Sequence, residues 1–224
     1  MKAVLLRVGI DSQYGGNVGP IFEDGSFEYV PIPEDEKTTE ERTYSDTKGR
    51  SGELFSTFVG KIFKNMKIHF DPEFETFTYG DHLTKSKIFA RMDKNDYLIF
   101  YSGLKPYRNV SYPRGLYIIG YFCIDTVFIY DDLLNNTTKE KLKNNAHIKR
   151  GDNARDTVIL KGFPEKSRLL KKVIHISKEG KEHWIASDQF CDIIGKPCDY
   201  NLLRSSPRAV EGKFAKDLMK FIDV

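Results

Sequence analysis

The stretch that decides the fold is a pair of apolar runs, NDYLIFYSGL at residues 95–104 and GLYIIGYFCIDTVFIY at residues 115–130. Both runs are rich in aromatic and β-branched residues, which favour β-strands. The first run predicts a fully apolar strand at Tyr97–Tyr101. The second predicts a long, bent strand with Gly120 at a bulge or corner. We therefore expect a sheet to form the core of the protein.

Shorter elements extend this core along the chain. AVLLRVG at residues 3–9 predicts a first strand with Arg7 inside it, and Asp24-Gly25 between two apolar segments predicts a hairpin. Residues 34–50 are polar and charged, so we expect an exposed, mobile loop there. Further strands are expected at residues 158–160 and 173–176. Helical spacing of apolar residues predicts helices at residues 51–65, 83–92, 131–142, 189–195 and 205–222.

The order of these elements predicts one α+β domain over residues 1–224, with a mixed, barrel-like sheet and flanking helices. The chain contains no internal repeat and no low-complexity linker. Its 224 residues carry 35 Lys and Arg against 32 Asp and Glu, a net charge of +3. This weak basic balance permits a nucleic-acid partner without arguing for one.

Composition excludes several classes of protein. The apolar runs are too short and interrupted for a membrane span, and the N-terminus is too short for a signal peptide. Three cysteines without a CxxC pair make a disulfide framework or a structural zinc site unexpected. We therefore expect a reduced, cytoplasmic protein.

One segment, HFDPEFETFTYGDH at residues 69–82, gathers residue types that could carry chemistry. His69 and Asp71 share a face of an extended strand, but Pro72 breaks the run, and metalloenzyme motifs are absent. No metal and no other cofactor is predicted on this evidence. The phenylalanines of the segment are expected in the core. Gly80 in the turn TYGD permits close approach, which leaves Tyr79 and Asp81 to line a cleft.

Three other features allow two interpretations each. Arg7 is either an edge residue that points to solvent or a cation aimed into a cleft. His147 and Arg150 lie either in a surface turn or in a pocket. The loop at residues 105–114 interleaves rings with cations, as surfaces that stack on exposed bases do, or else it is a solvated face. The residues of this feature are Tyr101, Lys105, Tyr107, Arg108, Tyr112 and Arg114.

Two stretches, LLRVGIDSQYGGNVGPIFEDGSFEYVPIP and HFDPEFETFTYGD with the DYLIFYSGL that follows it, together resemble the third nucleotide-modification-associated domain family. Its members are associated with DNA base hypermodification, and the resemblance implies no catalytic role for any residue. Gln13 and Tyr14 stand where smaller residues are expected, which puts a glycine-loop role in doubt. The positions that the resemblance implies as a shared site are Arg7, Asp11, Gly15, Gly16, Asp71, Tyr79, Gly80, Asp81, Tyr101 and Gly103.

NDYLIFYSG with GLYIIGYFCI is also similar to the central strands of PUA-like barrels, which bind RNA or modified DNA bases in a cleft. Three functions follow from these observations. The first is a nucleic-acid-associated protein that binds a nucleotide or modified base. The second is an enzyme acting on a nucleotide or base, with Asp11, Asp71 and Asp81 as acid–base groups beside Arg7. The third is an interaction protein without chemistry. The sequence leaves open DNA against RNA and the oligomeric state.

Overall fold

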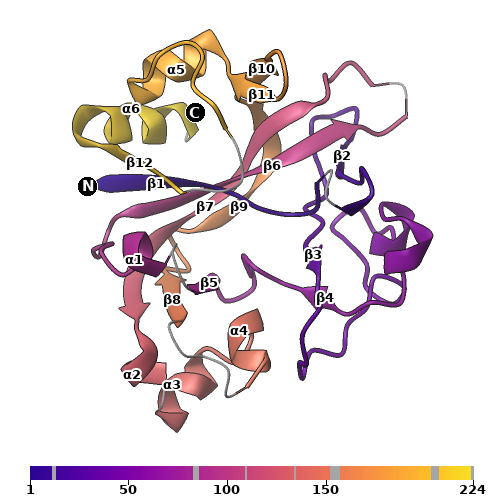
Figure 1. Cartoon of the computed structure of the whole chain (residues 1–224), viewed down its shortest axis with the longest axis vertical. Helices are drawn as coiled ribbons and strands as arrows, with labels where there is room; N and C mark the ends of the chain where they lie inside the picture. The colour runs from indigo at the N-terminus through magenta and orange to yellow at the C-terminus, as the bar shows by residue number, and fades with distance from the viewer. Residues whose placement is uncertain are drawn as a thin grey trace.

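The computed structural model describes residues 1–11, 14–82, 86–108, 110–133, 135–151, 157–202 and 207–222. Eight strands form one mixed sheet in the order β12-β1-β6-β7-β8-β5, with β2 paired to β6 and β9 paired to β7 (Figure 1). Helices flank this sheet, so the predicted α+β class is confirmed. The strands of the sheet are β1 (Lys2–Arg7), β2 (Gly19–Ile21), β5 (Thr78–His82), β6 (Tyr97–Pro106), β7 (Gly115–Phe128), β8 (Thr157–Gly162), β9 (Arg168–His175) and β12 (Arg208–Glu211).

The two apolar runs form the long antiparallel pair β6 and β7 at the middle of the sheet. The register between β7 and β9 shifts between Ile118 and Gly120, which confirms the predicted irregularity. Glycine is needed at this point, because a Cβ on Gly120 would lie 2.7 Å from the carbonyl oxygen of Arg168 and 2.9 Å from Phe74 Cε1. The absence of a side chain therefore lets β9 and Phe74 pack directly on β7.

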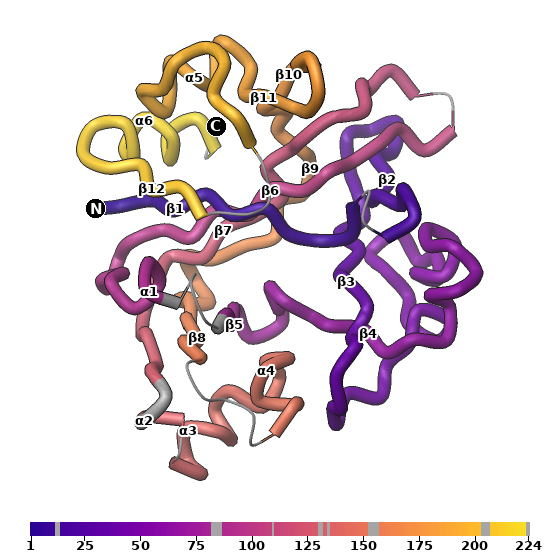
Figure 2. Tube along the Cα trace, viewed as in Figure 1, coloured from indigo at the N-terminus to yellow at the C-terminus, as the bar shows by residue number. Residues whose placement is uncertain are grey.

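β1 lies between β6, to which it is parallel, and β12, to which it is antiparallel. Both of its faces are covered, since Ala3, Val4, Leu5 and Leu6 are all buried. The helices α5 (Asp188–Ile194) and α6 (Gly212–Ile222) pack against each other on one side of this part of the sheet, as the chain traces of Figures 1 and 2 show. Gly195 caps α5 with a φ of 65°, so the predicted helix stop is confirmed.

Several predicted helices are wrong or shorter than expected. Residues 51–65 form only two 3-10 turns, η2 (Phe55–Thr57) and η3 (Lys61–Phe63). The helical spacing there instead fills a second small core, since Phe55, Phe58 and Val59 pack with Tyr44 and Ile68. The remaining helices are α1 (Ser86–Phe89), α2 (Tyr130–Leu133), α3 (Asn136–Lys141) and α4 (Ala146–Lys149).

Local signals explain these corrections. Asn135 is the N-cap of α3, and its side chain accepts a hydrogen bond from the Thr137 N–H, so the predicted helix at 131–142 is divided. In the C-terminal segment, residues 208–211 pair with β1 as a strand, and the helix begins only at Gly212. Residues 83–85 of the predicted helix at 83–92 lie outside the described residues. None of the described helices has the length and apolar character that crossing a bilayer requires.

The predicted hairpin at Asp24-Gly25 is confirmed by the bridge between Ile21 and Phe27 and by the φ of 82° at Gly25. Two further short pairs lie outside the large sheet. β10 (Ser177–Glu179) pairs with β11 (Trp184–Ala186), and β3 (Ile32–Pro33) pairs with β4 (Ile68–His69). The second pair fixes His69 opposite Ile32.

The polar segment at residues 34–50 is not uniformly exposed, which corrects the sequence prediction. Glu34, Glu40 and Tyr44 in it are buried. The carboxylate of Glu40 accepts hydrogen bonds from Arg42 Nη2 at 2.9 Å and Lys149 Nζ at 2.6 Å. Charged residues that were expected to be exposed therefore attach this segment to α4.

Glu40 makes the stability of this attachment depend on pH. Burial raises the pKa of Glu40, but hydrogen bonds from Arg42 and Lys149 outweigh burial and lower the pKa from 4.5 to about 2. A carboxyl with a depressed folded-state pKa stabilises the fold above its unfolded pKa, and this stabilisation is lost as pH falls through the folded value. We expect the free energy of unfolding of wild type to exceed that of Glu40→Gln at about pH 6, and this excess to shrink toward about pH 3. Urea unfolding of both proteins checks this, and an equal excess at both pH values would contradict it.

Candidate functional site

A compact polar cluster lies where the end of β4, the segment after it and α4 meet. It consists of His69, Asp71 and His147, whose ligand-type atoms all lie within 4.8 Å of one another. His147 Nε2 is 3.5 Å from Asp71 Oδ2, and His69 Nε2 is 4.0 Å from the same oxygen. All three side chains are less than 10% exposed. The fold thus brings together a sequence-predicted residue, Asp71, and a histidine more than seventy positions away.

Asp71 is held by two hydrogen bonds, and the peptide bond between Asp71 and Pro72 is cis. Its Oδ1 accepts a hydrogen bond from the Gly80 N–H at 2.9 Å, and its backbone carbonyl accepts one from Tyr29 Oη at 2.9 Å. These contacts leave Oδ2 directed toward the two imidazoles. The orientation of this carboxylate is therefore fixed by backbone as well as by side chains.

His147 lies in α4, whose N-cap is Asn145. The Asn145 Oδ1 accepts a hydrogen bond from the His147 N–H at 3.0 Å, and its Nδ2 donates to Thr78 Oγ1 at 3.2 Å. A Cβ on Gly80 would lie 3.0 Å from His147 Cγ and still closer to Cδ2. The close approach predicted for Gly80 is thus made by this histidine. The sequence left His147 between a surface turn and a pocket.

A buried ion pair between Glu34 and Arg150 contacts the cluster at His69. Arg150 Nη2 donates to Glu34 Oε1 at 2.7 Å and its Nε donates to Oε2 at 3.0 Å. Glu34 Oε2 also lies 2.8 Å from His69 Nδ1. Burial raises the pKa of Glu34, but hydrogen bonds from His69 and Arg150 outweigh burial and lower the pKa to about 2. Glu34 is therefore a carboxylate at neutral pH and can only accept in a hydrogen bond with His69 Nδ1, which also lies 3.2 Å from Arg150 Nη2.

Tyr79 and Asp81 occupy the other face of β5, because alternate side chains of a strand point to opposite sides. The Tyr79 hydroxyl donates to Asp81 Oδ2 at 2.6 Å, and the Tyr79 ring packs against Phe89 and Phe100. Tyr79 is thus anchored in the core at its ring and polar at its tip. Asp81 is half-buried.

Arg7 does not project to solvent, which excludes the first of its two interpretations. Its side chain is 14% exposed, and its Nη2 lies 3.9 Å from Oδ2 of the buried Asp11. Arg7 is paired in register with Tyr101 at the end of β1, and a Cβ on Gly103 would lie 3.6 Å from its Nη2. Arg7, Asp11 and Gly103 therefore lie close together, and the shared site that the resemblance implied for them stays a prediction. Gly15 and Gly16 follow Asp11 with φ of 70° and 76°.

The other predicted binding residues lie elsewhere. Tyr101 is fully buried, and its hydroxyl accepts from Arg208 Nη1 at 3.0 Å, so its ring is not exposed for stacking. The basic loop lies at the tip of the β6–β7 hairpin, away from β5 and α4 (Figure 1). In it Tyr107 packs edge-on against Phe22 and Phe58. Lys105, Arg108 and Arg114 are exposed there.

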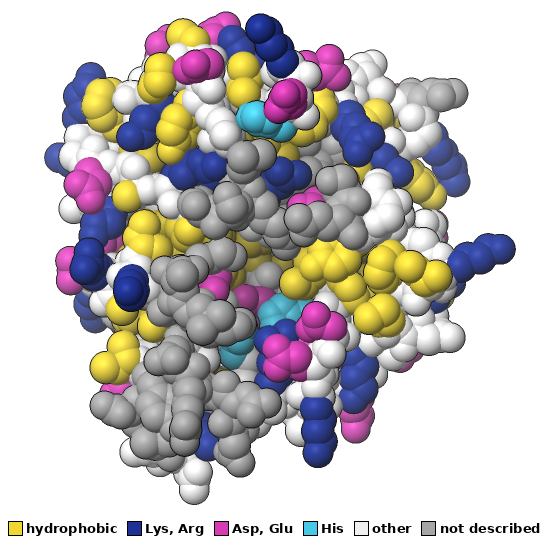
Figure 3. Space-filling model, in the orientation of Figure 1, with side chains coloured by type: hydrophobic (Ala, Val, Ile, Leu, Met, Phe, Trp, Pro, Cys, Tyr) yellow, Lys and Arg dark blue, Asp and Glu magenta, His cyan; other side chains and the backbone are white. Residues whose placement is uncertain are grey.

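Figure 3 shows a hollow near the middle of one face, with histidine and acidic side chains visible in it and hydrophobic side chains beside it.

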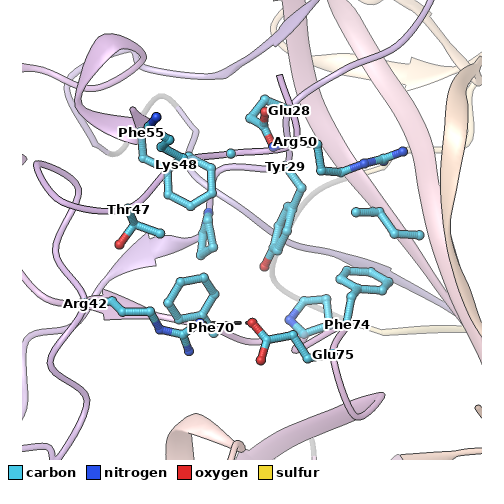
Figure 4. A pocket seen from close by; sticks show the side chains of 14 residues that line it. Glu28, Tyr29, Arg42, Thr47, Lys48, Arg50, Phe55, Phe70, Phe74 and Glu75 are labelled. Carbon is cyan, nitrogen blue, oxygen red and sulfur yellow. Dashed lines mark hydrogen bonds and ion pairs between the residues drawn. The ribbon is translucent and has the colours of Figure 1, made fainter. Parts of the chain in front are cut away.

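A second cavity lies on the opposite side of residues 69–72, and Figure 4 shows its wall. Phe70 and Pro72 line it, whereas His69 and Asp71, which alternate with them, belong to the polar cluster. Its volume is about 260 Å³. The sequence interpretation placed Phe70 and Phe74 in the core and missed this cavity, because alternation alone does not distinguish a core from a pocket wall. The remaining lining residues are Glu28, Tyr29, Pro31, Arg42, Thr47, Lys48, Gly49, Arg50, Phe55, Phe74, Glu75 and Leu169.

The sequence model of the nucleotide modification associated domain 3 family matches residues 2–200. The chain belongs to this family. The nucleotide modification associated domain 3 region includes the polar cluster, the Arg7–Asp11 pair and the aromatic cavity, and the resemblance drawn from the sequence is confirmed. Strand β12 and helix α6 follow it.

A solved structure that matches the whole chain is described as the N-terminal domain of Thermococcus gammatolerans McrB bound to m5C DNA. The identity is 12% and the TM-score 0.38, and the match covers 100% of this chain and 98% of that chain. A similarity this low gives no information about the function of this member of the nucleotide modification associated domain 3 family. A comparison with curated proteins finds no match.

Proposed function

We propose that this protein binds a nucleobase, as part of a nucleotide or of DNA, in the cavity of Figure 4. The observation that carries the proposal is the chemistry of that cavity. The rings of Tyr29, Phe55, Phe70 and Phe74 surround a volume of about 260 Å³. A planar aromatic base gains most from such rings, since stacking is favourable for every base. The membership of the nucleotide modification associated domain 3 family agrees with a ligand of this class.

The rim of the cavity offers polar groups for the edge of a base. Arg42 lies over the Phe70 ring at 3.9 Å from its centroid, and its Nη1 donates to Glu75 Oε1 at 3.0 Å. Figure 4 shows this ion pair closing one side, with Lys48 and Thr47 near Phe55 on another. Carboxylate and ammonium groups supply an acceptor and a donor, which is what recognition of a base edge requires.

DNA rather than a free nucleotide would also need cations for its phosphates. Exposed Lys105, Arg108 and Arg114 at the tip of the β6–β7 hairpin are candidates for this contact. Phosphate contacts weaken steeply with salt, so binding of an oligonucleotide is expected to be strongest at low salt. Equal affinity for a nucleoside monophosphate and for an oligonucleotide at low salt would assign the ligand to the free nucleotides.

We expect Phe70→Ala to weaken binding of a single-stranded oligonucleotide by roughly tenfold or more, because loss of one stacking ring costs about 1–3 kcal/mol. Fluorescence anisotropy with a labelled oligonucleotide of mixed sequence measures this. Phe163→Ala is the matched control, since Phe163 is also half-buried beneath a cation, Lys166, and lies outside the cavity. Thermal unfolding of both variants separates binding from stability. Unchanged affinity in Phe70→Ala would sink the proposal.

A second candidate function is an enzyme that acts on the bound nucleotide or base. The observation that favours it is the Asp71 carboxylate beside two imidazoles, a set of groups that can accept and return protons. Asp11 and Asp81 stay candidates for the same work. Mass spectrometry of nucleotides and DNA after incubation with the protein distinguishes an enzyme from a binding protein, because only an enzyme changes their mass.

A further inference from the structure

We infer that His69, Asp71 and His147 form a binding site for one divalent transition-metal ion. The three residues come from two separate parts of the chain, and their ligand atoms lie within 4.8 Å of one another. This inference rests on the polar cluster and not on the aromatic cavity. It would stand even if no base bound in that cavity.

The distances fit a metal site better than they fit hydrogen bonds. Two ligand atoms at about 2.1 Å from one ion, at a tetrahedral angle, are about 3.4 Å apart. The His147 Nε2 to Asp71 Oδ2 distance is 3.5 Å, and the His69 Nε2 to Asp71 Oδ2 distance is 4.0 Å. An N–H···O hydrogen bond is usually about 2.7–3.2 Å long. To bind one ion, the three ligand atoms, which lie within 4.8 Å of one another, would move closer together.

The hydrogen bond to Glu34 determines which nitrogen of His69 faces the cluster. Glu34 accepts hydrogen bonds from Nε and Nη2 of Arg150, and its Oε2 lies 2.8 Å from His69 Nδ1. A neutral His69 with its proton on Nδ1 directs the lone pair of Nε2 toward Asp71 Oδ2. Two electron-rich atoms that face each other in a buried site repel, and a cation between them removes the repulsion. A carboxylate on the far nitrogen is also the usual partner of a metal-binding histidine.

The other two ligands are fixed as firmly as His69. The Gly80 N–H occupies Oδ1 of Asp71, which leaves Oδ2 for an ion. The cap of Asn145 orients the start of α4, on which His147 lies, and Gly80 gives the His147 ring room. Ligands held in this way need little rearrangement to bind.

The ligand set selects the class of metal. Two imidazoles and one carboxylate suit Zn²⁺, Fe²⁺, Mn²⁺ and Co²⁺, whereas Ca²⁺ and Mg²⁺ prefer oxygen ligands alone. Three protein ligands leave at least one coordination position for water or substrate, as in catalytic rather than structural sites. The alternative is a protonated His69 that pairs with Asp71 without a metal.

Equilibrium dialysis of chelator-treated full-length protein against Zn²⁺ and Co²⁺, followed by elemental analysis, tests the inference. We expect one ion per chain in wild type and in the control His175→Ala, whose exposed ring stacks on Tyr117 outside the cluster. His147→Ala and Asp71→Asn are expected to lose saturable binding, and Glu34→Gln to bind about 10- to 100-fold more weakly. Mg²⁺ is expected not to compete.

X-ray absorption spectroscopy at the zinc edge identifies the ligands of the bound ion directly in the wild-type protein, without any substitution. Two imidazole ligands and at least one oxygen ligand are expected. Wild type that binds none of Zn²⁺, Fe²⁺, Mn²⁺ or Co²⁺ would overturn the inference and favour the protonated histidine. Stoichiometric binding that His147→Ala retains, or a spectrum without imidazole, would overturn it as well.

Discussion

Arg150→Ala is expected to destabilise the protein by about 3–5 kcal/mol, because it leaves the carboxylate of Glu34 buried without its cation. The side chain of Glu34 is only 1% exposed, and the Arg150 guanidinium donates to both of its oxygens. Water can replace these hydrogen bonds only if Glu34, directly after β3, separates from Arg150 at the end of α4. Urea unfolding at neutral pH measures the loss.

A double substitution separates the charge effect from lost packing. Glu34→Gln combined with Arg150→Met removes both charges and keeps much of the volume, so it is expected to recover a large part of the stability. The matched control is Arg168→Ala, since the Arg168 side chain is exposed and its guanidinium lies 5.5 Å from the centroid of the Tyr121 ring. A loss in Arg150→Ala no larger than in Arg168→Ala would show that the ion pair contributes little.

Gly80→Ala is expected to cost about 3 kcal/mol, the upper part of the range for inserting a methyl group into a packed site. The new Cβ would lie 3.0 Å from His147 Cγ, nearer still to Cδ2, and 3.2 Å from Asn145 Oδ1. The ring and the cap of α4 would both have to move. Because His147 would leave its place beside Asp71, we also expect Zn²⁺ affinity to fall in a variant that still folds.

Gly60→Ala is the control for this substitution. Gly60 has a φ of −64°, and the nearest atom to a Cβ there would be Asn17 Nδ2 at 3.5 Å, an ordinary contact. Thermal unfolding of both variants is therefore expected to show a large loss only for Gly80→Ala. Equal melting temperatures would mean that α4 moves freely, and the proposed rigidity of His147 would be wrong.

The sheet was predictable because its strands carry strong local signals. Residues 97–101 and 115–128 are continuous apolar runs, and Gly120 marked the place where another strand crosses closely. The helix predicted at 51–65 does not form. The spacing of Phe55, Phe58 and Val59 also suits an irregular segment whose apolar side chains fill a small core. The pairing of residues 208–211 with β1 depends on a contact across the whole chain, which no local pattern contains.

The candidate site was predictable only in part, for the same reason. The segment at residues 69–82 indicated Asp71 and Gly80 by residue type and turn chemistry. His147, Glu34 and Arg150 join them through tertiary contacts, and nothing near them in the sequence distinguishes them from other charged surface residues. Metal binding was not predicted for His69 and Asp71, because Pro72 breaks the strand after them and the sequence contains no metalloenzyme motif. Nothing in the structure tests His82, whose side chain lies outside the described residues.

The position of β1 has a consequence for how the chain matures on the ribosome. This strand is made before both of its neighbours, residues 97–101 and 208–211. Until β6 is synthesised, four consecutive apolar side chains of β1 lack their parallel neighbour, and the other edge of β1 stays unpaired until residues 208–211 emerge. An unpaired apolar edge is a template for association with other chains. Nascent chains of this protein are therefore exposed to aggregation through β1 until both neighbours have been synthesised.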